Sequence, residues 1–314
     1  MKTVAITGVN GYIGSSVAKR LIENGYNIIG LSIEEKPIID HPDLLYIQVD
    51  LTNWKQVQSI MKDNNIDVLF HFAGIAHVLK GQKIPDEAYT RINYLAAKNL
   101  FSCAYSKDIR VFFASTIDVY GACEELVWSE DVIPKPVSMY GKTKYLAECS
   151  LNGIYKGKNG NYLIGRFAPV YSNDHMKDAY KRIYVKYPNL AMTLGTRPTY
   201  TLLALENLVN FVAWWVEGGN VEKNIINVCD EVEMKTEDFI LLEKGAGRAK
   251  NIIKVPYFFV KIFAWIANKL LYSDSKAELG LALTKLFRPR MIEKTQIVNT
   301  RCCCKEMKEI IYKS

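Results

Sequence analysis

The residues with the clearest chemical potential are Tyr140 and Lys144, which lie four positions apart in a stretch of helical character. Residues four apart share one face of an α-helix, so the phenol and the ammonium would lie side by side. A phenol has a pKa of about 10, which is too high for a base at neutral pH, and a nearby cation lowers that value by favouring the phenolate. The spacing makes Tyr140 a candidate acid/base for a hydroxyl or ketone; the alternative is a helical tyrosine beside an exposed lysine.

Two hydroxyl residues, Ser115 and Thr116, follow an apolar run that begins at Val111. Ligands of open α/β sheets bind at the carboxyl ends of the strands, so one of these hydroxyl groups could hydrogen-bond a reacting oxygen or contact the substrate. The alternative is a strand-end turn that the hydroxyl groups stabilise.

A glycine-rich segment follows the first apolar run and has the sequence Thr7-Gly8-Val9-Asn10-Gly11-Tyr12-Ile13-Gly14. Glycine permits a sharp strand-to-helix turn, lets the backbone approach a pyrophosphate, and leaves the helix N-terminus open to phosphate. The segment therefore predicts a dinucleotide site, and the alternative is that the glycines only shape the turn. The candidate residues are Gly8, Asn10, Gly11, Tyr12, Ile13 and Gly14.

The ends of the next two apolar runs supply further candidate cofactor contacts. Asp50 and Leu51 follow the third run, where the carboxylate could accept a hydrogen bond from an adenine amino group or instead cap the next helix. Ser32 lies near the end of the second run, at the position where an acidic residue often binds the ribose 2′-hydroxyl. Because Ser32 is not acidic and no arginine is nearby in sequence, NAD and NADP both stay open, with NAD as the first candidate.

Short apolar runs alternate with segments of helical period through the first half of the chain. Strands that alternate with helices predict parallel pairing, and hence an α/β fold with a doubly wound parallel sheet. We expect residues 1–168, with return segments near 200–230, to form the dinucleotide-binding domain, and residues 169–314 mainly a smaller C-terminal substrate lobe. The predicted strands are Val4–Thr7, Ile28–Ile33, Leu45–Val49, Val68–Phe72, Val111–Ser115, Leu163–Arg166 and Ile225–Val228.

Composition narrows the classes of partner. The net charge of +7 favours anionic ligands such as phosphates, but the basic residues are scattered and no nucleic-acid partner is expected. The opening apolar run is too short for a signal peptide, and seven cysteines, an odd number, indicate reduced thiols in a cytoplasmic protein. Cys302, Cys303 and Cys304 are adjacent and lack a CxxC partner, which favours an incidental surface cluster over a metal site.

The very apolar segment from Val255 to Leu271 has two interpretations. It is short and contains Lys261, so we do not expect it to span a membrane. It could lie on a membrane surface, or it could be a buried helix of the C-terminal lobe. We favour the buried helix.

Taken together, the motifs resemble the extended short-chain dehydrogenase/reductases, also called the NAD-dependent epimerase/dehydratase family. The resemblance covers most of the first 171 residues and depends on the order of the motifs, since each alone is weak. It implies a Rossmann-type domain and a smaller substrate lobe. The matching pieces are the glycine segment, Asp50-Leu51, His71-Phe72-Ala73-Gly74, Asn93, Ser115-Thr116 with Val119-Tyr120-Gly121, Tyr140 with Lys144, and Arg166-Phe167-Ala168-Pro169-Val170-Tyr171.

The same resemblance implies roles for individual residues. Thr116, Tyr140 and Lys144 would form the catalytic group, and Lys144 would also hold the nicotinamide ribose. The backbone of Phe72–Gly74 would lie alongside the cofactor, and Asn93 would help to shape the sheet near the site.

A nucleotide-diphosphate sugar is the implied substrate, because Leu190–Gly195 and Tyr200–Val209 resemble the start of the substrate lobe in sugar-nucleotide enzymes. His77 lies in a segment that resembles 4-keto sugar reductases and could touch the substrate, although a lone histidine is more often structural. Arg197 could neutralise the diphosphate or be a solvated loop residue.

Two activities fit the resemblance: an epimerase that recycles bound NAD at sugar C4, and a 4-keto sugar reductase that uses free NAD(P)H. Ile117-Asp118 lacks the acidic pair that typical 4,6-dehydratases carry after their threonine, which argues against dehydration. A candidate of another class is a dinucleotide-binding regulator without catalysis, but such a protein has no need of Thr116, Tyr140 and Lys144 together. The family resemblance also implies a possible homodimer.

Overall fold

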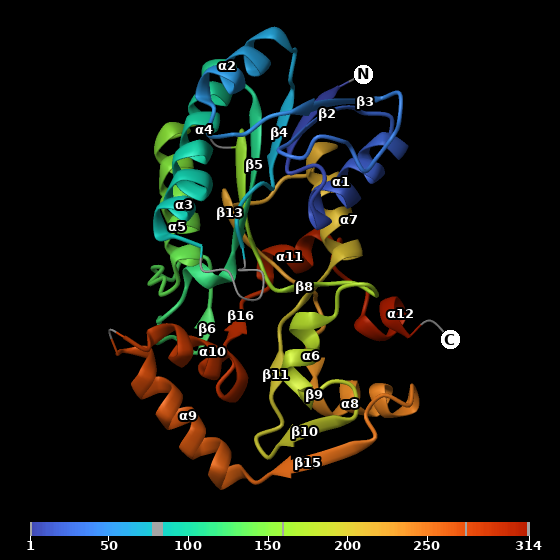
Figure 1. Ribbon diagram of the computed structural model, residues 1–314, viewed down its shortest axis with the longest axis vertical. Coiled ribbons are helices and arrows are strands. Elements are labelled where there is room, and N and C mark those ends of the chain that lie inside the picture. Colours follow the sequence, from blue (N-terminus) through green and yellow to red (C-terminus); the bar gives the residue numbers. More distant parts are fainter. Residues whose placement is uncertain (1, 77–83, 159, 274, 313–314) are drawn as a thin grey trace. The chain divides into compact units, whose positions relative to one another are not determined.

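The computed structural model describes residues 2–76, 84–158, 160–273 and 275–312, and its chain forms two compact units (Figure 1). The first unit comprises Met1–Val119, Ser138–Arg166 and Val209–Ile226, and the second comprises Tyr120–Val137, Phe167–Leu208 and Asn227–Ser314. The chain therefore crosses from one unit to the other several times.

A seven-stranded sheet forms the centre of the first unit, in the order β13-β7-β5-β4-β1-β2-β3. The pairs β1–β2, β1–β4, β2–β3 and β4–β5 are parallel. All seven predicted strands are present, which confirms the predicted doubly wound α/β fold. The strand order reverses between β1 and β4, and open sheets of this kind bind ligands at that point, beyond the carboxyl ends of the strands. The strands are β1 (Thr3–Thr7), β2 (Asn27–Ser32), β3 (Leu44–Gln48), β4 (Val68–His71), β5 (Arg110–Thr116), β7 (Tyr162–Phe167) and β13 (Ile225–Val228).

Helices cover both faces of this sheet, as the buried apolar strands of a parallel sheet require (Figure 1). Apolar residues of α2, α4 and α5 join one core cluster with the strands, whereas α1 and α7 lie on the other face, where Phe211 and Trp215 contact Phe112. The helices are α1 (Tyr12–Glu23), α2 (Trp54–Asp63), α3 (Asp86–Tyr89), the π-helical turn η1 (Thr90–Ala96), α4 (Ala97–Ser106), the 3₁₀ turn η2 (Ile117–Val119), α5 (Met139–Ile154) and α7 (Leu205–Val216).

The second unit has small sheets and several helices around a core of its own. In its largest sheet, β10 (Leu190–Leu194) pairs antiparallel with β9 (Tyr184–Lys186) and parallel with β15 (Asn251–Val255). Tyr171, Ile183, Tyr200 and Phe239 are among the buried residues of the core. The remaining elements are β6 (Val127–Trp128), β8 (Val170–Tyr171), α6 (Lys177–Ile183), β11 (Thr199–Tyr200), β12 (Leu203–Ala204), β14 (Met234–Lys235), α8 (Thr236–Gly245), α9 (Tyr257–Leu271), α10 (Ala277–Phe287), β16 (Met291–Ile292), α11 (Thr295–Thr300) and α12 (Met307–Ile311).

The apolar segment near residue 260 is a helix, as predicted, but it is not buried. Of α9, only Val260, Ala267 and Leu271 are buried, and α10 packs alongside the helix (Figure 1). The prediction of a buried helix was wrong because an apolar sequence fixes the helix but not what covers it. No helix of the described residues is long and apolar enough to cross a membrane.

The expected surface cluster of three cysteines is only partly correct. Cys304 is exposed, but Cys303 is fully buried, and its backbone carbonyl accepts a hydrogen bond of 3.0 Å from the Glu231 amide. All seven cysteines are free thiols. Among the described residues no group of three or more His, Cys, Asp or Glu side chains could hold a metal ion.

Candidate functional site

The glycine segment forms a tight turn between β1 and α1. Gly8 has φ of +70°, a conformation that favours glycine, and a Cβ there would meet the Ala73 backbone at 3.0 Å. A Cβ on Gly14 would lie only 2.2 Å from the Gly8 carbonyl oxygen, so α1 and the turn touch through backbone atoms. Gly11 caps α1 without a side-chain hydrogen bond, and the first turn of α1 has no acidic residue. The backbone cradle and the open helix N-terminus both fit a pyrophosphate group.

We expect Gly14→Ala to weaken dinucleotide binding by at least about tenfold and to lower the free energy of unfolding by about 1–3 kcal/mol, because the added methyl group forces the turn and α1 apart. Gly153→Ala is the matched control, since a Cβ added to that helical glycine would lie in open space. This change should raise the free energy of unfolding by up to about 1 kcal/mol. Calorimetric NAD titration and urea unfolding measure both effects. Unchanged affinity in the Gly14 variant would contradict the assignment of this turn.

A buried histidine joins the end of β1 to the end of β4. The Thr7 hydroxyl lies 2.7 Å from Nδ1 of His71 and accepts a 3.3 Å hydrogen bond from the Ala73 amide. The imidazole stacks on Phe113, and its Nε2 has no hydrogen-bond partner among the described residues. Burial, together with the charge of Lys144, lowers the pKa of His71 from 6.5 to about 3. The histidine is therefore neutral and supports the backbone on which Ala73 and Gly74 lie.

This histidine should contribute to acid unfolding. Between pH 6.5 and about 3 the unfolded chain binds a proton at His71 that the folded chain does not. The free energy of unfolding should therefore fall as the pH is lowered through this window, by up to about 1.4 kcal/mol per pH unit from this group. Urea unfolding across the window should show that His71→Gln removes this part of the slope, whereas His41→Gln, at an exposed histidine, retains it. An unchanged slope in the His71 variant would show that the group does not act in this way.

Gly74 lies against two polar side chains of the predicted site. A Cβ at Gly74 would meet Oδ1 of Asn93 at 3.0 Å and Nζ of Lys144 at 3.5 Å. Asn93 lies in the π-helical turn η1, accepts a 2.8 Å hydrogen bond from the Ile75 amide, and donates to the Ile75 carbonyl at 2.9 Å. Asn93 thus holds the segment after β4 in place, and π-helical turns are frequent at functional sites.

Helix α5 carries Tyr140 and Lys144 on one face, and both lie close to the end of β5. Ser138 caps the helix, because its Oγ accepts a 3.0 Å hydrogen bond from the Gly141 amide. The Thr116 hydroxyl hydrogen-bonds to the Tyr140 phenol. Nζ of Lys144 donates to the Ala114 carbonyl at 2.8 Å and lies 4.8 Å from the centre of the Phe113 ring. The structure therefore brings together the three residues predicted as the catalytic group.

Electrostatics in this group differ from the simplest expectation. Burial, followed by the negative charge of Asp118, raises the pKa of Tyr140 above its usual value, and the hydrogen bond from Thr116 opposes this. Burial lowers the pKa of Lys144 to about 8, against the opposing effect of Glu148. The surrounding side chains therefore keep the phenol protonated at neutral pH, and only additional positive charge nearby would favour the phenolate.

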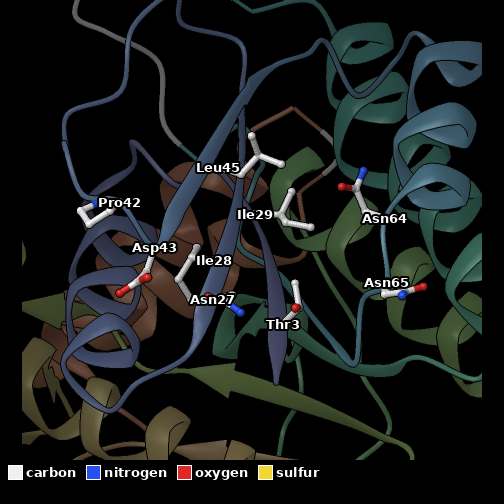
Figure 2. Close-up of a pocket in the computed structure, with 9 residues that line it drawn as sticks. All are labelled: Thr3, Asn27, Ile28, Ile29, Pro42, Asp43, Leu45, Asn64 and Asn65. Carbon is white, nitrogen blue, oxygen red and sulfur yellow. The ribbon is translucent and has the colours of Figure 1, made fainter. Parts of the chain in front are cut away.

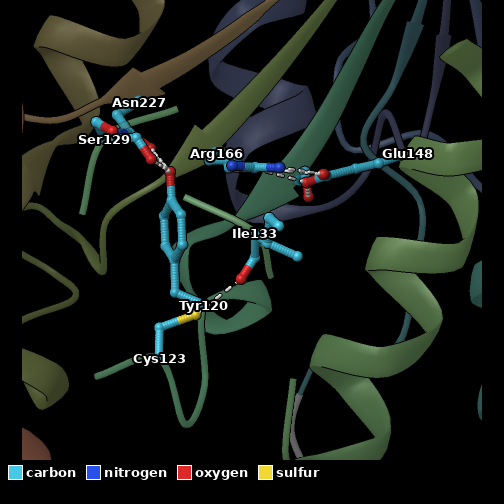
Figure 3. A network of polar contacts seen from close by, with 8 residues as sticks. Tyr120, Cys123, Ser129, Ile133, Glu148, Arg166 and Asn227 are labelled. Atoms are coloured by element: carbon cyan, nitrogen blue, oxygen red, sulfur yellow. Dashed lines mark hydrogen bonds and ion pairs between the residues drawn. The ribbon is translucent and has the colours of Figure 1, made fainter. Parts of the chain in front are cut away.

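The Ser115 hydroxyl contacts a buried ion pair that was not predicted from the sequence. This hydroxyl donates to Oε1 of Glu148, and Glu148 also receives hydrogen bonds of 3.2 Å from Nε and 2.8 Å from Nη2 of Arg166, through its two oxygens (Figure 3). The side chains of Glu148 and Arg166 are 1% and 2% exposed. A usable signal was present, since Glu148 follows Lys144 by one helical turn and Arg166 interrupts an apolar strand.

Tyr120, from the same predicted motif, lies in the second unit and is fully buried. Its hydroxyl lies 2.8 Å from Oδ1 of Asn227 and 2.9 Å from the Ser129 carbonyl (Figure 3). These contacts give Tyr120 an anchoring role within that unit.

The remaining predicted cofactor residues make contacts of their own. Nδ2 of Asn10 donates a 2.8 Å hydrogen bond to the Lys36 carbonyl, and Oδ1 accepts one of 3.1 Å from the Ile38 amide. Asn10 therefore fixes the loop after β2. The Ser32 hydroxyl donates to Glu34. Asp50 is exposed, and its carboxylate accepts a 2.8 Å hydrogen bond from the Thr52 amide. The residue that caps α2 is Asn53.

Leu51 packs against the core, and Tyr12 and Ile13 begin α1. Arg197 lies in the second unit, where it is 76% exposed and pairs with Glu237 at 3.2 Å. His77 lies outside the described residues. The cofactor and substrate roles of these residues stay predictions.

A hollow at the opposite edge of the sheet does not fit the predicted chemistry. Its lining includes Thr3 and Asn27, which begin β1 and β2, and Asn64 and Asn65 after α2 (Figure 2). Ligands of parallel α/β sheets bind at the carboxyl ends of the strands, where Gly8, Gly74 and Thr116 lie. This hollow is therefore not the dinucleotide site.

The sheet order and the turn after β1 define the class of Rossmann-type α/β proteins. A model of the NAD dependent epimerase/dehydratase family matches residues 4–212, and the chain belongs to this enzyme family.

The chain is also similar to individual proteins. An uncharacterized protein of Methanocaldococcus jannaschii is 29% identical over 292 residues, covering 85% of this chain and 82% of the relative. The UDP-glucose 4-epimerase of Bacillus subtilis is 29% identical over 167 residues, and the match covers 50% of this chain and only 49% of that enzyme. The crystal structure of a UDP-glucuronic acid 4-epimerase from Bacillus cereus, in complex with NAD, is similar in fold, with a TM-score of 0.63, 20% identity, and 81% and 87% of the two chains covered.

Proposed function

We propose that this protein is an NAD-dependent 4-epimerase of a nucleotide-diphosphate sugar, with Tyr140 as its acid/base. The observation that carries the proposal is the grouping of Thr116, Tyr140 and Lys144 beside Gly74, at the same sheet edge as the glycine turn. Membership of the epimerase/dehydratase family and similarity to a UDP-glucose 4-epimerase support it.

The residues that would hold NAD are those whose geometry fits it. The turn from Gly8 to Gly14 would bind the pyrophosphate through backbone amides, and Lys144 would bind the nicotinamide ribose. When bound, NAD supplies reversible two-electron oxidation of a sugar carbon. NAD takes precedence over NADP in the proposal because the residues after β2 are Glu34 and Glu35, whose charge disfavours a 2′-phosphate.

Tyr140 would move the proton of the sugar C4 hydroxyl. Thr116 already hydrogen-bonds to the phenol, so a sugar oxygen placed between the two hydroxyl groups would be held within reach of the base. Lys144 and the positive charge of oxidised nicotinamide would together lower the phenol pKa, which burial and Asp118 otherwise keep high. Glu148, paired with Arg166, would help to position Lys144 through its charge and the end of β5 through its hydrogen bond with Ser115.

The test is to purify the protein, denature it, and identify any dinucleotide released. The expected result is about one NAD per chain, and conversion of a UDP-sugar to its C4 epimer without added cofactor, followed by NMR over a panel of UDP-sugars. An empty protein that binds NADH or NADPH reversibly and reduces a 4-keto sugar nucleotide would replace the epimerase by a reductase. A protein that binds neither would contradict both, and would favour a non-catalytic role.

A further inference from the structure

Helix α9 and the strand before it present a broad apolar surface, which we call the α9 face. Beyond its three buried residues, seven large side chains of α9 are between 37% and 68% exposed: Tyr257, Phe258, Phe259, Ile262, Phe263, Trp265 and Ile266. Ile252 and Ile253 of β15 are also exposed, at 37% and 45%. Large apolar side chains exposed in such number on one helix mark an interaction site.

The charged residues of α9 and of the chain segment that leads into it all have one sign. Lys250, Lys254, Lys261 and Lys269 are exposed, and the sequence has no acidic residue between Glu243 and Asp274. Nζ of Lys261 lies 4.7 Å from the ring centre of Tyr257, and Nζ of Lys269 lies 5.6 Å from that of Trp265. The lysine stems thus lie along the aromatic rings and present their ammonium groups next to the apolar surface.

Exposed aromatic side chains beside lysines favour an anionic bilayer over a second copy of this chain as the partner of the α9 face. A symmetric dimer through the face would bring the lysines of one copy against those of the other, and the cores of protein interfaces are poor in lysine. An anionic bilayer satisfies both features, because aromatic side chains bury into the headgroup boundary while lysines attract acidic lipids. The helix has 15 residues, about 22 Å, so it can lie in the interface but is too short for a hydrocarbon core of about 30 Å.

We propose that the α9 face docks this protein on the surface of a membrane containing anionic lipid. Binding is peripheral, with α9 parallel to the bilayer. It is independent of the proposed epimerase activity, since none of these residues belongs to the first unit that carries the candidate site.

Co-sedimentation of the purified full chain with lipid vesicles tests this proposal. We expect binding to vesicles of phosphatidylcholine with phosphatidylglycerol, weak binding to phosphatidylcholine alone, and release by high salt. Trp265 is 66% exposed, whereas Trp128 and Trp215 are buried and Trp54 and Trp214, both of the first unit, are partly buried. Vesicles should therefore shift the tryptophan emission to the blue in the wild type but not in Trp265→Phe. Lys261→Glu combined with Lys269→Glu should lower partitioning by at least about tenfold.

The matched control is Leu241→Ser, which removes a side chain that is 65% exposed on α8, outside the α9 face. Phe258→Ser with Trp265→Ser should abolish vesicle binding, while Leu241→Ser should not, and circular dichroism melts should show all variants folded. Absence of binding to anionic vesicles, or binding that the α9 variants leave unchanged, would overturn the proposal. So would a dimer, seen by light scattering, that the Phe258 and Trp265 variants dissociate, because the face would then be occupied by a second copy.

Discussion

Tyr140→Phe is expected to lower turnover by about 10²–10⁴-fold while NAD binding stays largely intact, because the change removes only the hydroxyl group that would move the proton. The side chain keeps its ring and its place on α5, so the helix and the Lys144 contact to the Ala114 carbonyl should be retained. Steady-state kinetics on the sugar nucleotide identified from the panel, together with the NAD content of the purified variant, measure the two effects.

Tyr145→Phe is the matched control for this change, since Tyr145 is on the same helix but one residue beyond Lys144. We expect that variant to keep nearly full turnover. A Tyr140→Phe enzyme with activity within a few-fold of the wild type would contradict the acid/base assignment, whatever its cofactor content.

The second large effect is expected at the buried ion pair. Arg166→Met should lower the free energy of unfolding by about 3–5 kcal/mol, because it leaves the Glu148 carboxylate buried without its cation. Adding Glu148→Met to the same chain should recover much of the loss, since the double change buries no unpaired charge. Urea unfolding of the single and double variants measures the difference.

The matched control removes the same residue type from an exposed pair. Arg197→Met breaks the contact with Glu237, where both side chains are at least half exposed, and should change stability little. If Arg166→Met were as mild as Arg197→Met, the pair would not stabilise the first unit in the way its burial indicates. Loss of stability in the double variant as large as in the single would show that packing at Arg166, and not the charge of Glu148, is responsible.

Local sequence determined the elements that build the site. Runs of Val, Ile and Phe bounded by turn residues identified all seven strands of the central sheet, because strands buried on both faces are apolar throughout. Gly8, Gly11 and Gly14 marked the turn, and the four-residue spacing of Tyr140 and Lys144 placed them on one helix face, since both depend only on backbone geometry.

Tertiary structure alone decided which side chains face one another. Ser115 and Thr116 are adjacent in sequence, yet one hydroxyl contacts Glu148 and the other Tyr140, because the position of α5 relative to the end of β5 selects the partner. Asn10 lies in the glycine turn but binds the loop near Lys36. In the same way, the composition of α9 specified an apolar helix but not its exposure, because burial depends on which other elements the fold brings against it.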